Sequence, residues 1–125
     1  MTAKCSILII DDDKHDRFLF KEFLSRANDV NYMFEEANTG DMALLLYEQR
    51  KYDCVLLDFM MHGMTGIEFL EHLQEKNIAL IPTIFISNHL NPLIIERAKE
   101  LGIAAYLEKS DLTSEILHKT VSQLV

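Results

Sequence analysis

The chain has 125 residues, of which 49% are hydrophobic and 26% charged, a composition typical of one folded domain rather than of a disordered segment. Twenty acidic and twelve basic side chains give a formal net charge of −8. This balance argues against direct nucleic acid binding, because duplex phosphates require a basic surface. The sequence also lacks the run of about 18 apolar residues that a membrane span needs, and it lacks a secretory signal. We therefore expect a cytoplasmic single domain over 1–125 that binds neither nucleic acid nor membrane.

Strand-like and helical patterns alternate in the first 50 residues. The apolar run at 6–10 predicts a strand that is buried on both faces of a parallel sheet. A helical spacing of apolar residues follows, and Asp13 is placed to cap that helix. Residues 31–35 predict a second strand nearer a sheet edge, because polar side chains interrupt it. The turn at 38–40 then leads into a second helix.

The same alternation continues to the end of the chain. Residues 54–57 and 82–86 predict two further buried strands, and residues 104–107 predict a fifth. The glycine-containing loop at 62–66 leads into a third helix, and Pro92 fits the first turn of a fourth. The helical stripes expected to face the core include Phe20, Phe23, Leu24, Met42, Ala43, Leu46, Tyr47, Ile67, Leu70, Leu73, Ile94, Ala98, Leu101, Ile116, Leu117 and Val121.

Five strand–helix units in succession indicate an α/β fold. Parallel strands joined by right-handed crossover helices form one sheet with helices on both faces. The sequence therefore predicts a doubly wound, five-stranded parallel sheet flanked by five helices.

Four of the five predicted strands end at strongly polar residues. Asp11 and Asp12 follow the first strand, Asp58 the third, Ser87 the fourth and Lys109 the fifth. In an open α/β sheet ligands bind beyond the carboxyl ends of the strands, so these side chains are expected to share one edge.

Three carboxylates in one pocket need positive charge nearby, because unit charges about 4 Å apart repel by roughly 4 kcal/mol at an effective dielectric of 20. One lysine does not suffice, and Mg²⁺ is a hard cation that prefers oxygen ligands. A metal ion, a lysine and a carboxylate nucleophile are the groups that phosphoryl transfer to a protein requires. The residues alone leave the three carboxylates nearly interchangeable as the acceptor.

Four segments, in this order along the chain, carry a family resemblance: ILIIDDD at 7–13, VLLDFMMHGMTG at 55–66, TIFIS at 83–87 and AAYLEK at 104–109. Together they make the sequence similar to the receiver domain of bacterial two-component response regulators over essentially its whole length. The resemblance implies a flavodoxin-like receiver fold with strand order 2-1-3-4-5.

The resemblance also implies a role for each polar residue. Its D-x-x-M pattern and the following glycine match Asp58-Phe59-Met60-Met61 and Gly66, which makes Asp58 the phosphoacceptor. Mg²⁺ would be held by the side chains of Asp11, Asp12 and Asp58 and by the backbone carbonyl of Met60. The phosphoryl group would be contacted by Ser87 and Lys109.

The implied function is a phosphorylation-controlled switch rather than an enzyme acting on other molecules. A sensor histidine kinase or a histidine phosphotransfer protein would donate the phosphoryl group to Asp58. Ser87 and Tyr106 would then rearrange and change the binding of a downstream effector protein or a fused output domain. The relay surface would be formed by the fourth helix, the fifth strand and the fifth helix.

Some positions depart from the family's usual pattern or are expected to modulate the reaction. His62 and Ser110 stand where proline is common, and Asn88 stands where a small residue is usual. Asn88 is expected to narrow access to Asp58, and the bond before Ser110 to be trans unless its loop enforces a cis form. Met60 and His89 occupy positions that influence how water reaches the phosphoryl group.

Two other functions fit parts of the sequence. A pseudo-receiver would act as a phosphorylation-independent interaction module in spite of its acceptor aspartate. A small phosphatase of the haloacid dehalogenase type would use Asp11 as its nucleophile, because it also begins with an apolar strand and an Asp-x-Asp pair. The residue that takes up phosphate distinguishes these possibilities.

Overall fold

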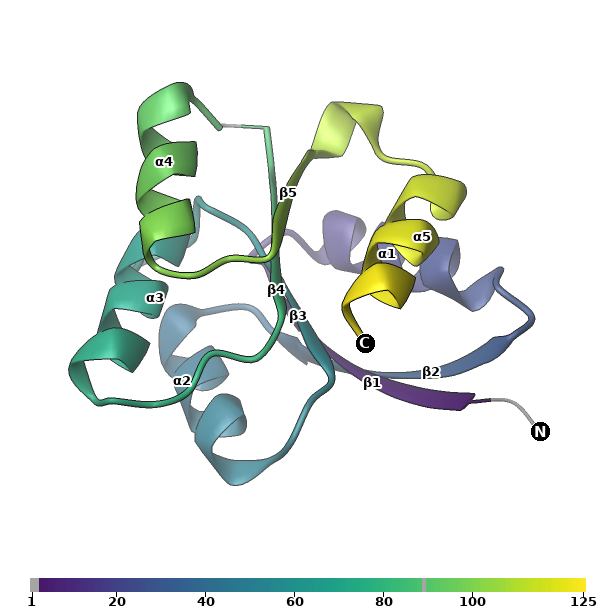
Figure 1. Cartoon of the computed structure of the whole chain (residues 1–125), viewed down its shortest axis with the longest axis horizontal. Coiled ribbons are helices and arrows are strands. Elements are labelled where there is room, and N and C mark those ends of the chain that lie inside the picture. The colour runs from purple at the N-terminus through teal and green to yellow at the C-terminus, as the bar shows by residue number, and fades with distance from the viewer. Residues whose placement is uncertain (1–2, 89) are drawn as a thin grey trace.

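The computed structural model describes residues 3–88 and 90–125, and it forms one parallel sheet with the strand order β2-β1-β3-β4-β5 (Figure 1). This order and the five flanking helices confirm the predicted fold. The strands are β1 (Ala3–Ile10), β2 (Val30–Ala37), β3 (Cys54–Leu57), β4 (Thr83–Ser87) and β5 (Ala105–Glu108). The helices are α1 (Lys14–Ser25), α2 (Gly40–Gln49), α3 (Gly66–Glu75), α4 (Pro92–Glu100) and α5 (Ser114–Leu124), and a short 3-10 helix, η1 (Lys109–Asp111), follows β5.

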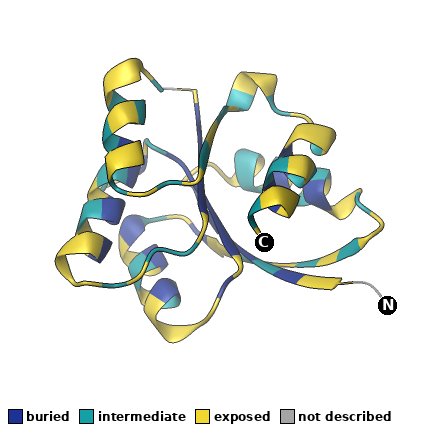
Figure 2. Cartoon of the chain, in the orientation of Figure 1, coloured by how far each residue is buried: buried dark blue, intermediate teal, exposed yellow. Residues whose placement is uncertain are grey.

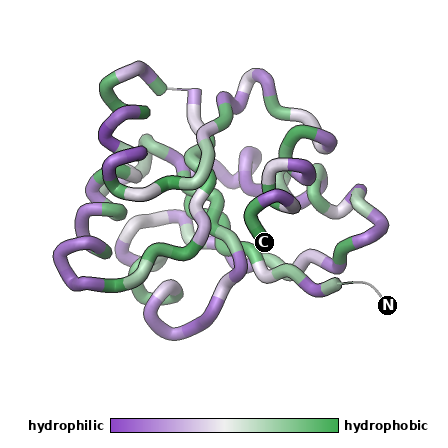
Figure 3. Tube along the Cα trace, viewed as in Figure 1, coloured by the Kyte–Doolittle hydropathy of each residue, from purple (hydrophilic) through white to green (hydrophobic). Residues whose placement is uncertain are grey.

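The sheet separates two layers of helices. Helices α2, α3 and α4 cover one face, and α1 and α5 cover the other (Figure 1). Alternate residues of β1 supply the two cores, with Leu8 and Ile10 on the first face and Ile7 and Ile9 on the second. Burial and hydrophobicity are concentrated in the central strands (Figures 2 and 3). Burial on both faces explains why these strands read as continuous apolar runs.

The first two strands extend beyond their predicted limits. β2 begins at residue 30 and pairs with β1 over eight residues, Ala3 to Ile10 opposite Val30 to Ala37. Glu36 lies within β2, one residue beyond the predicted strand, and its carboxylate forms ion pairs with Arg17 and Lys21 at 2.9 Å each. β4 starts one residue after Pro82, and β5 is shifted by one residue toward the C-terminus.

Most of the predicted helical core is confirmed, with two exceptions. Phe20, Leu24, Leu117 and Val121 are among the buried residues. In contrast, Met42 and Ile116 are 45% and 40% exposed, so their predicted place in the core is wrong. A helix contacts the sheet along one stripe, and residues at the edge of that stripe remain partly in water even when they are apolar.

Side chains cap the helices as the sequence suggested for the first one. Asp13 accepts hydrogen bonds from the backbone N–H groups of His15 and Asp16, and Pro92 occupies the first turn of α4. Both cysteines are free thiols, and burial raises the pKa of Cys5 to about 11 and of Cys54 to about 12. Among the described residues, no helix has the length and apolar character required to cross a bilayer.

Candidate functional site

The carboxyl ends of the central strands bring the predicted site residues together. β1 and β3 are neighbours in the sheet, and the backbone N–H of Asp58 donates to the carbonyl of Ile10 at 2.9 Å. This bond fixes Asp58 beside the residue that precedes Asp11. Both aspartates are almost fully buried, whereas Asp12 is exposed. The parallel sheet therefore gathers acids that lie far apart in the sequence onto one edge.

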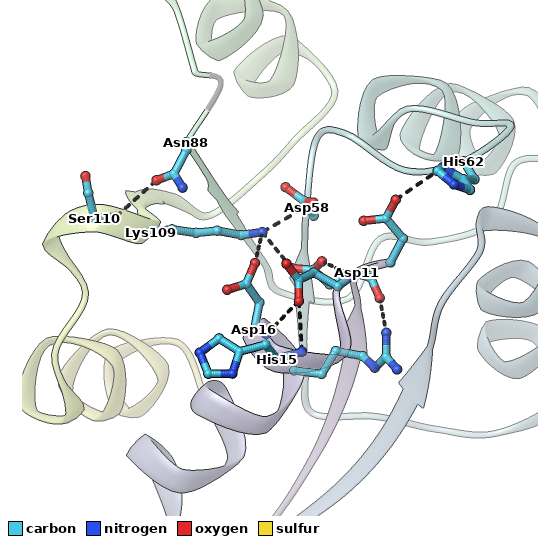
Figure 4. Close-up of polar contacts among 11 residues, drawn as sticks. Asp11, His15, Asp16, Asp58, His62, Asn88, Lys109 and Ser110 are labelled. Carbon is cyan, nitrogen blue, oxygen red and sulfur yellow. Dashed lines mark hydrogen bonds and ion pairs between the residues drawn. The ribbon is translucent and has the colours of Figure 1, made fainter.

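Lys109 reaches into this group from the end of β5 (Figure 4). Its ammonium nitrogen lies 2.9 Å from Asp11 Oδ2 and 3.4 Å from Asp58 Oδ2. The lysine side chain is itself largely buried, so both contacts are sheltered from solvent. The predicted convergence of residues 11, 58 and 109 is present in the structure.

Asp11, Asp12 and Asp58, here called the acid cluster, have the donor set of a cation site. Each offers one carboxylate oxygen, and these three oxygens lie within 4.8 Å of one another. Asp58 Oδ1 is buried and accepts no hydrogen bond within the described part of the chain. An all-oxygen donor set with a buried, unsatisfied carboxylate oxygen fits Mg²⁺, which prefers oxygen ligands.

Burial sets the direction of the pKa shift for the two buried aspartates but not for Lys109. It raises the pKa of Asp11 to about 6, although hydrogen bonding to Lys109 and to the Asp13 N–H acts in the opposite direction. The pKa of Asp58 is also raised by burial, against the charge of Lys109 and the Ser87 hydroxyl. Burial alone would lower the pKa of Lys109, but hydrogen bonds to Asp16 and Asp11 outweigh it and raise that pKa.

The sequence pattern missed one member of the site, Asp16 in the first turn of α1. Its Oδ2 accepts a hydrogen bond from Lys109 Nζ at 2.8 Å, the shortest of the three contacts of this ammonium (Figure 4). The only signal in the sequence was an acidic residue near a helix N-terminus, which is common for reasons unrelated to any site. Nothing local connects it to a lysine 93 residues away.

The two proposed switch residues lie on adjacent strands with different exposure. Ser87 is fully buried at the end of β4, where it opposes Glu108 of β5. Tyr106 is 42% exposed on β5, and the ammonium of Lys99 from α4 lies 5.3 Å from its ring centroid. The serine thus faces the site while the tyrosine ring lies at the surface against α4.

The loop between β3 and α3 carries two of the expected modulators, Met60 and His62. Met60 is exposed, whereas Met61 is buried in the core, which agrees with a packing role for the latter. The His62 ring nitrogen Nδ1 lies 3.5 Å from Asp12 Oδ2, although its side chain is almost wholly exposed. The end of the loop requires glycine at position 66, because a Cβ there would lie 2.5 Å from the Asp58 carbonyl oxygen and 2.6 Å from the Phe85 ring.

The loops after β4 and β5 are joined by a contact that the sequence did not suggest. The N–H of Ser110 donates to Asn88 Oδ1 at 3.1 Å, and Figure 4 shows the Asn88 side chain directed toward Ser110. A proline at position 110 would have no N–H to donate. No peptide bond in the described residues is cis, so the bond before Ser110 is trans. His89, a predicted modulator, lies outside the described residues.

Comparison with known proteins agrees with the fold. A family model described as the response regulator receiver domain matches residues 7–121. The chain belongs to this receiver family. It is 35% identical over 119 residues to the nitrate/nitrite response regulator protein NarL of Escherichia coli, a match that covers 94% of this chain and 53% of the relative. The receiver chain thus spans about half the length of this curated relative.

Solved receiver structures have the same architecture. The signal receiver domain of the putative response regulator NarL from Mycobacterium tuberculosis superposes with a TM-score of 0.83 at 30% identity, covering 97% of this chain and 95% of that one. The chemotaxis response regulator CheY4 of Vibrio cholerae matches with a TM-score of 0.81 at 25% identity over the full length of both chains. These similarities confirm the receiver fold and the family that the sequence motifs suggested.

Proposed function

We propose that this receiver accepts a phosphoryl group on Asp58 in a Mg²⁺-dependent reaction. The observation that carries the proposal is the position of Asp58 at the end of β3. Its carboxylate belongs to the acid cluster and also lies 3.4 Å from the ammonium nitrogen of Lys109. Asp11 is also buried, but its Oδ1 is engaged by the backbone N–H of Asp13 at 2.9 Å. Asp11 Oδ2 and Asp58 Oδ1 are alike in being buried without a hydrogen-bond donor of good geometry among the described residues, so the preference for Asp58 over Asp11 rests on the D-x-x-M pattern that begins at Asp58.

The reaction would be an in-line displacement at phosphorus. A carboxylate oxygen of Asp58 attacks, an oxygen–phosphorus bond forms, and the bond from phosphorus to the donor breaks. With a phosphohistidine donor the leaving imidazole nitrogen keeps the bonding electron pair and takes a proton from solvent. Lys109 supplies positive charge for the phosphoryl oxygens, and the Ser87 hydroxyl is placed to donate to one of them.

The acid cluster would hold the metal ion through Asp11, Asp12 and Asp58, with the Met60 carbonyl as a further ligand. The ion supplies positive charge that offsets the approach of an anionic donor to three carboxylates. Asp12, the exposed member, leaves the site open to solvent on that side. A donor protein would therefore approach along the strand-end edge of the sheet.

Output would follow a shift between two conformers. A phosphoryl group on Asp58 would draw Ser87 inward and favour a different packing of Tyr106, which changes the surface formed by α4, β5 and α5. The donor would be a sensor histidine kinase or a histidine phosphotransfer protein. The target would be an effector protein or a fused output domain. In support, matched relatives are longer and include a probable cyclic di-GMP phosphodiesterase of Vibrio cholerae, of which the match covers 24%.

Incubation with acetyl phosphate and Mg²⁺, followed by intact mass spectrometry, tests the proposal. The parent protein should gain one phosphoryl group, and both omission of Mg²⁺ and Asp58→Asn should prevent the gain. Asp41→Asn, which removes an exposed acid of α2, is the matched control and should react like the parent. A folded parent that stays unmodified would favour the pseudo-receiver, and an adduct that survives Asp58→Asn but not Asp11→Asn would favour the phosphatase.

A further inference from the structure

We propose that Asp16 is a positioning residue that holds Lys109 away from the phosphoacceptor and competes with the phosphoryl group for its ammonium. The inference rests on the proposed function of Asp58. Lys109 Nζ lies 2.8 Å from Asp16 Oδ2 but 3.4 Å from Asp58 Oδ2. The Lys109 ammonium is therefore closer to Asp16 of α1 than to Asp58, the proposed phosphoacceptor.

The fold keeps Asp16 in place. Its backbone N–H donates to Asp13 Oδ1 at 3.3 Å, as part of the cap that starts α1. The side chain of Asp16 is partly sheltered, at 23% exposure, and projects from the first turn toward Lys109 (Figure 4). The cap thus fixes the backbone of Asp16 in α1, so the reach of its carboxylate toward Lys109 is limited to the length of one side chain.

Asp16 also stands outside the acid cluster that would bind the metal ion. The carboxylate oxygens that lie within 4.8 Å of one another come from Asp11, Asp12 and Asp58. A cation in the cluster would draw on Asp11, which is the second partner of Lys109. Asp16 would then be the remaining carboxylate that retains the ammonium in competition with Asp58.

After phosphorylation, Asp16 and the phosphoryl group on Asp58 would compete for the ammonium of Lys109. A phosphoryl group on Asp58 adds negative charge and strong acceptor oxygens within reach of the lysine. Lys109 has three N–H donors, but its nitrogen must move from the Asp16 side to bring them onto the new oxygens. Weakening the hold of Asp16 would therefore favour the transition state and the phosphorylated state.

The test compares Asp16→Asn with the parent in saturating Mg²⁺. The variant keeps the shape of the side chain and removes its charge. We expect a rate of phosphorylation by acetyl phosphate about three to ten times higher, the range of one ordinary hydrogen bond, because asparagine keeps an acceptor oxygen and loses only the charge. Affinity for beryllium fluoride, a mimic of the phosphoryl group measured by calorimetry, should rise by a similar factor.

Matched variants separate this role from a merely structural one. Glu22→Gln removes an exposed charge from the same helix and should leave both rate and affinity unchanged. Asp16→Glu restores the carboxylate and should return both toward the parent values. Asp16→Ser repeats the test if Asp16→Asn unfolds, as judged by urea denaturation.

The outcomes distinguish this inference from the proposed function. A parent that cannot be phosphorylated on Asp58 contradicts the proposed function itself. A parent that reacts normally, with Asp16→Asn equal to it or slower, overturns only the role of Asp16. Slower reaction in that variant would mean that Asp16 prepares Lys109 for the reaction instead of restraining it.

Discussion

Replacing Asp58 by asparagine should make the metal-free protein more stable, although the side chain is buried. The carboxylate oxygens of Asp11, Asp12 and Asp58 lie within 4.8 Å of one another, and Lys109 lies 3.4 Å from Asp58. At an effective dielectric of 20, each acid pair costs about 3.5 kcal/mol and the lysine returns about 5 kcal/mol. Repulsion therefore exceeds attraction at Asp58 before the cost of burying its charge is added.

Solvent screens the exposed Asp12, so the net gain from Asp58→Asn should be about 1 to 3 kcal/mol in the free energy of unfolding. For a domain of this size, each kcal/mol corresponds to a rise of about 3 to 6 °C in Tm. Urea denaturation and thermal unfolding followed by circular dichroism, both in a chelator at neutral pH, measure the effect. Asp41→Asn is again the control and should shift the free energy by no more than about 0.5 kcal/mol.

Mg²⁺ should abolish or reverse the difference. A ligand that binds only the folded parent at about 100 times its Kd adds about 2.7 kcal/mol, and the variant has lost one ligand. A fall in stability of Asp58→Asn in the chelator, comparable to the loss expected for an ordinary buried polar side chain, would refute the electrostatic reasoning. So would a gain equal to that of the control.

Three further predictions concern the surroundings of the site. Gly66→Ala should lower the free energy of unfolding, measured by urea titration, by about 2 kcal/mol or more. The reason is that the new Cβ would collide with the Asp58 carbonyl oxygen and the Phe85 ring. An unchanged urea midpoint would show that the loop adjusts without cost and would contradict this prediction. The pKa of Asp11 is raised to about 6 from an unfolded value of about 4, so its contribution stabilises the metal-free fold below pH of about 4 and is lost as the pH rises through about 6. Asp11→Asn should therefore flatten the fall in stability over this pH window, and a parallel pH profile would contradict the assignment. Asn88→Ala should cost about 1 kcal/mol through loss of the hydrogen bond from Ser110, and Asn88→Asp, which keeps an acceptor oxygen, should recover most of it in the same denaturation assay.

The fold could be predicted from the sequence because the central strands are apolar throughout. Residues 54–57 were placed without error, since a strand buried on both faces has no polar residue to blur its limits. β2 was less clear because it lies at the sheet edge, and Glu36 within it is satisfied by Arg17 and Lys21 of α1. Those partners become visible only when the helix is packed against the strand.

The sequence predicted those site residues that directly follow strands, because the sheet topology fixes their positions. Asp11, Asp58 and Lys109 follow strands, and the carboxyl ends of parallel strands share one edge, so their convergence follows from topology. Asp16 and the contact between Asn88 and Ser110 depend on the rotation of α1 and on loop conformation. Neither of these is encoded in a local pattern, because each contact joins segments that are distant in the sequence.

The residue that carries the phosphoryl group can be read directly by chemical trapping. Borohydride reduces an aspartyl phosphate to homoserine, and tandem mass spectrometry then locates the altered residue after treatment of the protein with acetyl phosphate and Mg²⁺. We predict homoserine at position 58 alone, with none formed when Mg²⁺ is withheld. Homoserine at position 11, or an unaltered peptide from a protein shown to be folded, would contradict the assignment of Asp58 as the acceptor.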